Sequence, residues 1–414
     1  MARLVQKFGG SSLADADRIR SVAVRVVTAA DSGHEVCVVV SAMGQTTDDL
    51  LALATHVSTR PDARELDMLL TAGERISMAL LSMAIIELGR EALSFTGPQA
   101  GILTDTRHGR ARIMEVRPAR IVEALGCGKV VIVAGFQGRS TGRDVTTLGR
   151  GGSDMTAVAL AAALGADVCE IYTDMAGVFT ADPRVVPEAR KLSTVSYEEM
   201  LELSSYGSKV LMSRSVEVAR AQGVRIHVRS SFTDEEGTWI EKEERMEQAI
   251  ISGIAHDSSE AKVTILGVPD RPGIAAQVFR PLADAGLRVD MIVQNVSSEG
   301  KTDISFTLPE DELPGIEQLL ATVGEDVGAS GIVADPDIAK ISLVGAGMKS
   351  DSAVVADMFD ALADAGINIE IISTSSIRIS CVIRSTSLER AVRVVHDRFR
   401  LSDPLLEAPE RASG

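Results

Sequence analysis

The sequence predicts an α/β protein in which helices cover both faces of a mainly parallel sheet, followed by two smaller α/β units. Up to Phe232, short apolar and β-branched runs alternate with helical stretches, and this alternation favours parallel strands joined by crossover helices. An internal repeat then follows, in which Leu-Ala-Asp-Ala-Gly begins at Leu282 and again at Leu362. The chain has 414 residues, which is too long for one ordinary core, so we expect more than one domain.

The predicted elements of the first part follow from hydrophobic periodicity. Strands are expected at residues 4–8, 35–41, 129–134, 168–173 and 224–228. Helices are expected at 15–30, 67–88, 118–125, 154–164 and 208–221.

Each copy of the repeat reads strand, turn, helix, strand, and a further strand follows at 303–308 or 377–383. Each repeat unit is so short that it is near the lower limit for a stable core of its own, so we expect the two units to pack together. The repeat is interpreted either as an oligomerisation module or as a pair of small-ligand sensors. The segment 233–247 is highly charged and predicts a solvated connection. The expected division is 1–232, a linker at 233–248, repeat units at 249–335 and 336–404, and a tail at 405–414.

Composition excludes several classes of protein. The net charge is −16 and no segment concentrates basic residues, which argues against binding to nucleic acid. No signal peptide or apolar run of membrane-spanning length is apparent, so no membrane partner is expected. The four cysteines have no disulfide or metal-ligand spacing, which indicates a reducing cytoplasm and no resident metal.

The most informative motif is the glycine-rich segment at residues 146–156, which runs directly into an expected helix. Glycines let backbone N–H groups approach an oxyanion, and a helix N-terminus favours negative charge. Arg150 is suited to clamp a phosphate or carboxylate, and Asp154 to order the loop or orient a reacting group. The alternative is an ordinary turn with Ser153 or Asp154 as the helix N-cap.

Other polar turns follow the first two strands. Neither a P-loop nor the glycine fingerprint of dinucleotide binding is present. Instead Lys7 ends the first strand before two glycines and two hydroxyls, which suits the neutralisation of a transferring phosphoryl group, although a solvated edge lysine is the alternative. A second turn runs from Ser41 to Thr47, and Glu74 interrupts a helical pattern as either a surface charge or a carboxylate aimed at an amine. Together these turns predict a cleft for phosphate and a small polar substrate.

These residues closely resemble the aspartokinase family. The motifs that carry the resemblance occur in that family's order and are Lys7-Phe-Gly-Gly-Ser-Ser, Val38-Val-Val-Ser-Ala-Met-Gly, Ala72-Gly-Glu-Arg, Gly135-Phe-Gln-Gly, Thr147-Leu-Gly-Arg-Gly-Gly-Ser-Asp, Tyr172-Thr-Asp, Thr180-Ala-Asp-Pro-Arg and Tyr206-Gly-Ser-Lys-Val-Leu. The resemblance implies an amino-acid-kinase α/β/α sandwich followed by two ferredoxin-like βαββαβ ACT units. It also implies transfer of the ATP γ-phosphoryl group to the β-carboxylate of L-aspartate, the first step toward lysine, threonine and methionine, with Mg²⁺ accompanying the nucleotide.

Residue roles follow from the same resemblance. Lys7 and Asp154 would be catalytic. Aspartate would be bound by Ser41, Thr47, Glu74, Arg150, Gly151 and Ser153. ATP would be bound by Lys7, Phe8, Gly9, Gly10, Ser11, Thr173, Asp174, Phe179, Arg184 and Lys209. A carboxylate acceptor is already ionised at neutral pH and needs no general base, so the lack of a catalytic histidine is expected.

Two departures from the family pattern stand in the site. The run Asp174-Met-Ala-Gly-Val-Phe179 lacks a carboxylate and a phenol that the family often has, and Met155 replaces a small polar residue. The rival interpretations are another carboxylate kinase of the same fold and a catalytically weakened amino-acid sensor.

The resemblance extends to regulation. It implies feedback inhibition by threonine and lysine, although Ser376 replaces a frequent glutamate and weakens the expectation for lysine. The assembly would be a homo-oligomer, or an α2β2 complex if translation also starts at Met246 to give a separate regulatory subunit. The expected effector residues are Asp270, Gly273, Ala275, Asp290, Gln294, Asn368, Ile369, Ser375 and Ser376.

Overall fold

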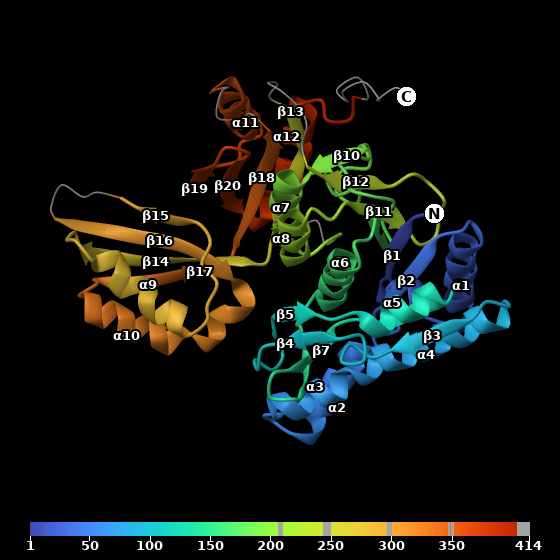
Figure 1. The fold of residues 1–414 in the computed structure, drawn as a ribbon. Helices are drawn as coiled ribbons and strands as arrows, with labels where there is room; N and C mark the ends of the chain where they lie inside the picture. Colours follow the sequence, from blue (N-terminus) through green and yellow to red (C-terminus); the bar gives the residue numbers. More distant parts are fainter. Residues whose placement is uncertain (206–209, 243–249, 296–299, 347, 349–351, 404–414) are drawn as a thin grey trace. The chain divides into compact units, whose positions relative to one another are not determined.

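The computed structural model describes residues 1–205, 210–242, 250–295, 300–346, 348 and 352–403 (Figure 1). The chain forms two compact units. Unit 1 comprises Met1–Val178 and Lys191–Arg245, and unit 2 comprises Phe179–Arg190 and Met246–Gly414.

Unit 1 is built on an eight-stranded sheet in the order β10-β12-β11-β9-β1-β2-β6-β3. Every neighbouring pair is parallel except β11 and β12, which confirms the predicted sheet. The strands are β1 (Arg3–Phe8), β2 (Glu35–Val40), β3 (Ala92–Phe95), β6 (Val130–Ala134), β9 (Val168–Thr173), β10 (Thr194–Ser196), β11 (Ile226–Ser230) and β12 (Thr238–Glu241).

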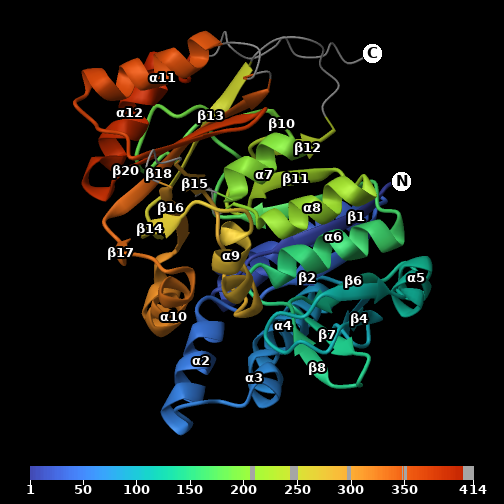
Figure 2. The same cartoon turned by 90° about the vertical axis from the view of Figure 1, so that its left-hand side faces the viewer.

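Helices cover both faces of this sheet, so β6 is apolar and buried throughout, and β2 is apolar and buried after Glu35. The helices α1 (Ala16–Asp31) and α4 (Ala72–Glu87) pack together in one layer. In the other layer α6 (Gly152–Leu164) packs with α8 (Ser213–Gln222), and Figure 2 shows these two helices side by side. The remaining helices are α2 (Thr46–Val57), α3 (Ala63–Leu70), α5 (Ala119–Gly126) and α7 (Tyr197–Ser205). A small sheet, β5-β4-β7-β8, contains β4 (Ile102–Thr104), β5 (Ile113–Val116), β7 (Gln137–Ser140) and β8 (Val145–Thr147).

The run Ala63–Glu87 is long and apolar enough to cross a membrane by length and composition alone. Such a run is weak evidence for a membrane span because core helices pass the same test. In this fold the run is α3 and α4, and the inward side chains Leu81 and Ile85 of α4 are fully buried in the core of unit 1.

The sequence predicts a linker at 233–248, but part of this charged segment belongs to the sheet of unit 1. Residues 238–241 form β12, which lies between β10 and β11 in the sheet of unit 1. Thr238 and Ile240 are fully buried, while Trp239 stacks on the ring of His227 at 3.9 Å between centroids. The alternation of buried and exposed positions is the pattern of a strand, and the surrounding glutamates conceal it in the sequence.

Unit 2 contains two four-stranded sheets, one for each copy of the repeat. The first copy has the order β15-β16-β14-β17, and α9 and α10 cover one face of its sheet (Figure 1). Its βαββαβ elements are β14 (Glu260–Pro269), α9 (Ile274–Asp284), β15 (Ile292–Gln294), β16 (Lys301–Pro309), α10 (Glu317–Val327) and β17 (Gly331–Asp335).

The second copy has the order β13-β18-β20-β19, and its edge strand β13 precedes the first copy in the sequence. The sequence places residues 250–257 in the first copy (249–335), but they form β13, which pairs antiparallel with β18 in the second. The second copy ends at α12 within the described residues, so β13 occupies the edge that β17 fills in the first copy. Its elements are β13 (Ile250–Asp257), β18 (Ile338–Ala346), α11 (Ser352–Asp364), β19 (Ile371–Thr374), β20 (Arg378–Arg384) and α12 (Leu388–Arg398).

The segment Phe179–Arg190 also belongs to unit 2, although residues on both sides of it belong to unit 1. Thr180 is fully buried, its carbonyl oxygen accepts from the N–H of Ile254 in β13 at 2.7 Å, and its Oγ1 lies 3.1 Å from Nε2 of His396 in α12. Ala181 and Val186 join the core of the second copy. The segment is therefore held by buried contacts within unit 2.

Candidate active site

The turns that follow four neighbouring strands of unit 1 begin at one edge of the sheet. The N–H of Ser41 donates to the carbonyl of Phe8 at 3.1 Å, and that of Gly135 donates to Val40 at 2.9 Å. The N–H of Gly9 donates to the carbonyl of Tyr172 at 3.3 Å. Because β1, β2, β6 and β9 are parallel, their carboxyl ends bring these turns together, where α/β sheets bind ligands.

Lys7 forms an ion pair with Asp154 at this edge. Lys7 Nζ lies 2.6 Å from Asp154 Oδ1, and the two side chains are only 12% and 9% exposed. Lys7 comes from β1 and Asp154 from the first turn of α6. The pair therefore places a shielded positive charge beside a helix N-terminus.

The glycine-rich segment has the backbone shape that its glycines permit. Gly149 and Gly151 have φ angles of 78° and 71°, in the left-handed region that glycine adopts readily. A Cβ on Gly151 would lie 1.9 Å from Cγ of Met212, so no larger residue fits there. Gly151 is the N-cap of α6, and the part of the chain that the structure describes provides no side-chain cap there, so the alternative in which Ser153 or Asp154 caps the helix is wrong. Since glycine has no side chain to cap the first N–H groups of α6, these groups suit an anion.

Arg150 and Ser153 flank this helix start. Arg150 is exposed, and within the described part of the chain its guanidinium is in none of the ion pairs. Ser153 is buried at 7% exposure, and a Cβ on Gly135 would lie 2.8 Å from its Oγ. The end of β6 therefore approaches α6 closely, and only a glycine at 135 allows it.

Glu74 lies in the first turn of α4 and is only 3% exposed. Among the described residues its Oε2 has no hydrogen-bond partner. Burial raises the pKa of Glu74 to about 7, and hydrogen bonds from backbone N–H groups, including that of Ala42, oppose this only partly. Its neighbour Gly73 packs on Ala42, since a Cβ at position 73 would lie 2.7 Å from Cβ of Ala42. A buried carboxylate of this kind is suited to an incoming cation such as an ammonium group.

Comparison with known proteins decides the family. Residues 2–230 match the model of the amino acid kinase family, and residues 262–325 and 341–399 match ACT domain models. Over 407 residues the chain is 57% identical to the aspartokinase of Mycolicibacterium smegmatis, and the match covers 97% of each chain. The chain belongs to the aspartokinase family. It is also 56% identical to the aspartokinase of Corynebacterium glutamicum over the same length.

Solved aspartokinase structures agree with this assignment. E. coli aspartokinase III in complex with aspartate and ADP has a TM-score of 0.83 at 25% identity, with coverage of 95% of this chain and 99% of that chain. The aspartate kinase from Synechocystis is 43% identical, with a TM-score of 0.54 and coverage of 96% and 69%. The resemblance to aspartokinases and the fold expected from it are thereby confirmed.

The nucleotide residues expected of an aspartokinase are divided between the units. Gly9, Gly10 and Ser11 follow β1, and Thr173 ends β9 with its Oγ1 donating to Asp174 at 2.9 Å. These residues lie at the same sheet edge as Lys7. Phe179 and Arg184 belong to unit 2, where Arg184 pairs with Asp182 at 2.7 Å, and Lys209 lies outside the described residues. No group of His, Cys, Asp and Glu that could hold a metal ion is found among the described residues.

Arg214 in α8 is a supporting residue that the sequence did not reveal. Its Nη1 donates to the carbonyl of Leu148 at 3.1 Å, and its Nη2 donates to that of Ala111 at 3.0 Å. Arg214 thus stabilises the backbone of the glycine-rich segment at Leu148. Met155 is 4% exposed and packs with Ala111 and Leu148, so this departure from the family pattern serves the core.

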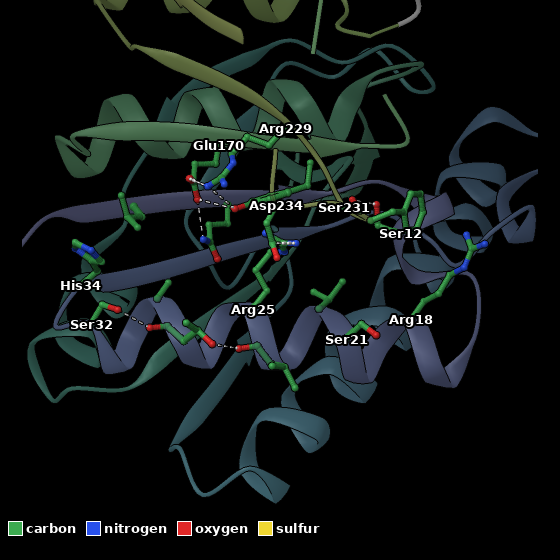
Figure 3. A pocket seen from close by; sticks show the side chains of 18 residues that line it. Ser12, Arg18, Ser21, Arg25, Ser32, His34, Glu170, Arg229, Ser231 and Asp234 are labelled. Atoms are coloured by element: carbon green, nitrogen blue, oxygen red, sulfur yellow. Dashed lines mark hydrogen bonds and ion pairs between the residues drawn. The ribbon is translucent and has the colours of Figure 1, made fainter. Parts of the chain in front are cut away.

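A cavity of 720 Å³ lies between α1 and the strands β1, β9 and β11 (Figure 3). Its cations already have carboxylate partners, because Arg229 lies 3.2 Å from Glu170 and Arg25 lies 2.9 Å from Asp234. The cavity includes neither Lys7 nor Asp154. We therefore assign the chemistry to the edge of the sheet.

Proposed function

We propose that this aspartokinase transfers the γ-phosphoryl group of ATP to the β-carboxylate of L-aspartate, giving 4-phospho-L-aspartate and ADP. The observation that carries the proposal is the shielded pair of Lys7 and Asp154 at the uncapped start of α6. A carboxylate oxygen attacks the γ-phosphorus while the bond to the β,γ-bridging oxygen breaks. The attacking group is already ionised, so positioning and charge neutralisation carry the catalysis.

Each side chain has a role in this proposal. Lys7 neutralises the transferring phosphoryl group, and Asp154 holds Lys7 in place. Glu74 binds the ammonium group of aspartate, and Arg150 binds its α-carboxylate. Further contacts to aspartate come from Ser41, Thr47, Gly151 and Ser153, and contacts to ATP come from Phe8, Gly9, Gly10, Ser11, Thr173, Asp174, Phe179, Arg184 and Lys209.

Mg²⁺ enters this proposal bound to ATP. Mg²⁺ in such sites usually keeps several waters and is held mainly by the phosphates of the substrate. When bound, the ion supplies charge neutralisation at the β- and γ-phosphates.

Trapping with hydroxylamine tests the choice of substrate, because acyl phosphates react with it to form hydroxamates. We expect ATP-dependent hydroxamate from L-aspartate and far less from L-glutamate. Product from glutamate alone would indicate another carboxylate kinase of this fold. Absence of product from either would indicate an amino-acid sensor that has lost catalysis.

For regulation we propose lysine and threonine as inhibitors that bind unit 2, placing the enzyme at the first step of lysine, threonine and methionine synthesis. Inhibition requires that the effectors favour a less active state of the enzyme. Initial rates with each amino acid alone and with both together test this. Rates unchanged under all three conditions would contradict it. The proposed contacts are Asp270, Gly273, Ala275, Asp290, Gln294, Asn368, Ile369, Ser375 and Ser376.

For assembly we propose a homo-oligomer, or an α2β2 complex if the messenger has an internal start at Met246, which lies outside the described residues. Intact-mass analysis of protein made from the natural gene distinguishes the two. We propose the cytoplasm as its location, and the four free cysteines suit a reducing compartment.

A further inference from the structure

Asp67 is a buried carboxylate that joins three segments of unit 1. It lies in α3 and is 1% exposed. Its oxygens accept from the N–H of Gly109 at 3.0 and 3.2 Å and from Oγ1 of Thr147 at 2.5 Å, and Nδ1 of His108 lies 2.7 Å away. Such a carboxylate holds Thr147 firmly, because the buried hydroxyl of Thr147 would lose its acceptor if the carboxylate were removed.

Two of these segments, those of Thr147 and Gly109, adjoin the turn that carries Arg150, a proposed aspartate contact. Thr147 ends β8, and the next residues form the glycine-rich turn that carries Arg150. The turn also approaches Gly109, since a Cβ on Gly149 would lie 3.0 Å from the Gly109 carbonyl oxygen.

The third segment, α3 itself, leads to Glu74, the other proposed aspartate contact. Asp67 precedes the junction of α3 and α4, and Glu74 lies in the first turn of α4. The N–H of Thr71 donates to the carbonyl of Asp67 at 3.2 Å, and Nε2 of Gln137 donates to that of Thr71 at 3.3 Å. Asp67 thus ties the helix junction before Glu74 to the turn that holds Arg150.

We propose that Asp67 is a positioning residue that sets selectivity for L-aspartate over L-glutamate. The inference rests on the proposed function, in which Glu74 binds the ammonium group and Arg150 the α-carboxylate. A fixed separation of these two groups fixes the place of the β-carboxylate relative to the phosphoryl group. Glutamate is longer by one methylene, and a rigid site distinguishes such substrates by about 10- to 200-fold.

The sharpest test changes one hydroxyl. Thr147→Val removes only the bond between β8 and Asp67, and the side chain keeps its shape. Thr146→Val is the matched control, because Thr146 is equally buried in β8 but lies 2.6 Å from the hydroxyl of Thr104 instead. We expect Thr147→Val to raise the KM for aspartate about tenfold, the loss expected for a hydrogen bond to a charged group. The KM for ATP should stay within about twofold.

The ratio of kcat/KM for aspartate and glutamate is the deciding readout. It should fall severalfold in Thr147→Val and stay unchanged in Thr146→Val. Asp67→Asn, which keeps one acceptor oxygen, should lower the ratio in the same direction. Equal ratios in all variants, with stability lowered alike in both threonine variants, would show that Asp67 is only structural. Failure of the unmodified enzyme to act on aspartate would instead refute the proposed function.

Discussion

Lys7 Nζ lies 2.6 Å from Asp154 Oδ1, so the first strand and the glycine-rich turn, far apart in the sequence, share one charge pair at the end of the sheet. Both side chains are largely shielded from water, and an electrostatic interaction is stronger in such a place than at the surface. The Lys7 ammonium group is therefore held in position before substrate binds.

Lys7→Ala removes this positive charge, and we expect kcat to fall by a factor on the order of 10²–10³, as when one donor to a transition-state oxyanion is lost. Steady-state rates measure the effect. Lys129→Ala is the control, because Lys129 pairs with Glu91 at 2.9 Å on the surface. A kcat that is the same in the two variants would remove Lys7 from the reaction.

Glu74 predicts a pH dependence of aspartate binding. Its pKa is raised to about 7, so below that pH the carboxyl becomes neutral and no longer attracts an ammonium group. We expect the KM for aspartate to rise as pH falls from 8 to 6. Glu74→Gln should have a high KM that changes little over this range. A parallel slope in the two proteins would assign the titration to another group.

The same shift predicts a change in stability. The native state keeps a proton on Glu74 that the unfolded chain releases, so the free energy of unfolding falls as pH rises from 4.5, the ordinary pKa of a glutamate, toward 7. The full effect is about 3 kcal/mol, since each pKa unit corresponds to about 1.4 kcal/mol. Urea unfolding of Glu74→Gln should therefore show a gain over the unmodified protein at pH 8 that disappears near pH 4.

Two lysines at equivalent positions of the repeat predict different contributions to the stability of unit 2. Lys340 is fully buried and lies 2.5 Å from Glu260 and 2.6 Å from Asp290. Its counterpart Lys262 is 19% exposed and pairs with Glu370. We expect Lys340→Met to destabilise unit 2 by about 3–5 kcal/mol, because Glu260, which is only 9% exposed, loses this cation.

Lys262→Met is the matched control and should cost less, because water reaches that pair. Hydrogen exchange of β14 and β18 amides measures both effects. Exchange that is equally fast in the two variants would contradict the difference in burial.

The sequence predicted the parts of this molecule that depend on local pattern. The parallel sheet and the polar turns after β1 and β2 follow from local pattern and from the rule that such turns gather at the carboxyl ends of parallel strands. The roles of Lys7, Glu74 and Arg150 stay predictions. Asp67 and Arg214 were missed because they act from inside helices, through bonds to distant backbone, and no spacing marks them.

The sequence also does not show which strands pair with one another over long range. A strand's alternation does not say which edge it joins, so β13 was assigned to the wrong copy of the repeat and β12 to a linker. The segment Phe179–Arg190 stands among kinase motifs, yet its apolar residues Ala181 and Val186 are buried in unit 2. Only the tertiary structure reveals that placement.

Oxygen transfer tests the central claim most directly. The enzyme is given ATP, hydroxylamine and L-aspartate labelled with ¹⁸O in the β-carboxylate. If that carboxylate attacks the γ-phosphorus, hydroxylamine releases phosphate that carries one ¹⁸O, and aspartate β-hydroxamate forms in equal amount. Mass spectrometry of the phosphate should show this label with the unmodified enzyme, and product should fall sharply with Lys7→Ala. Unlabelled phosphate without the β-hydroxamate would show hydrolysis of ATP by water and contradict the assignment.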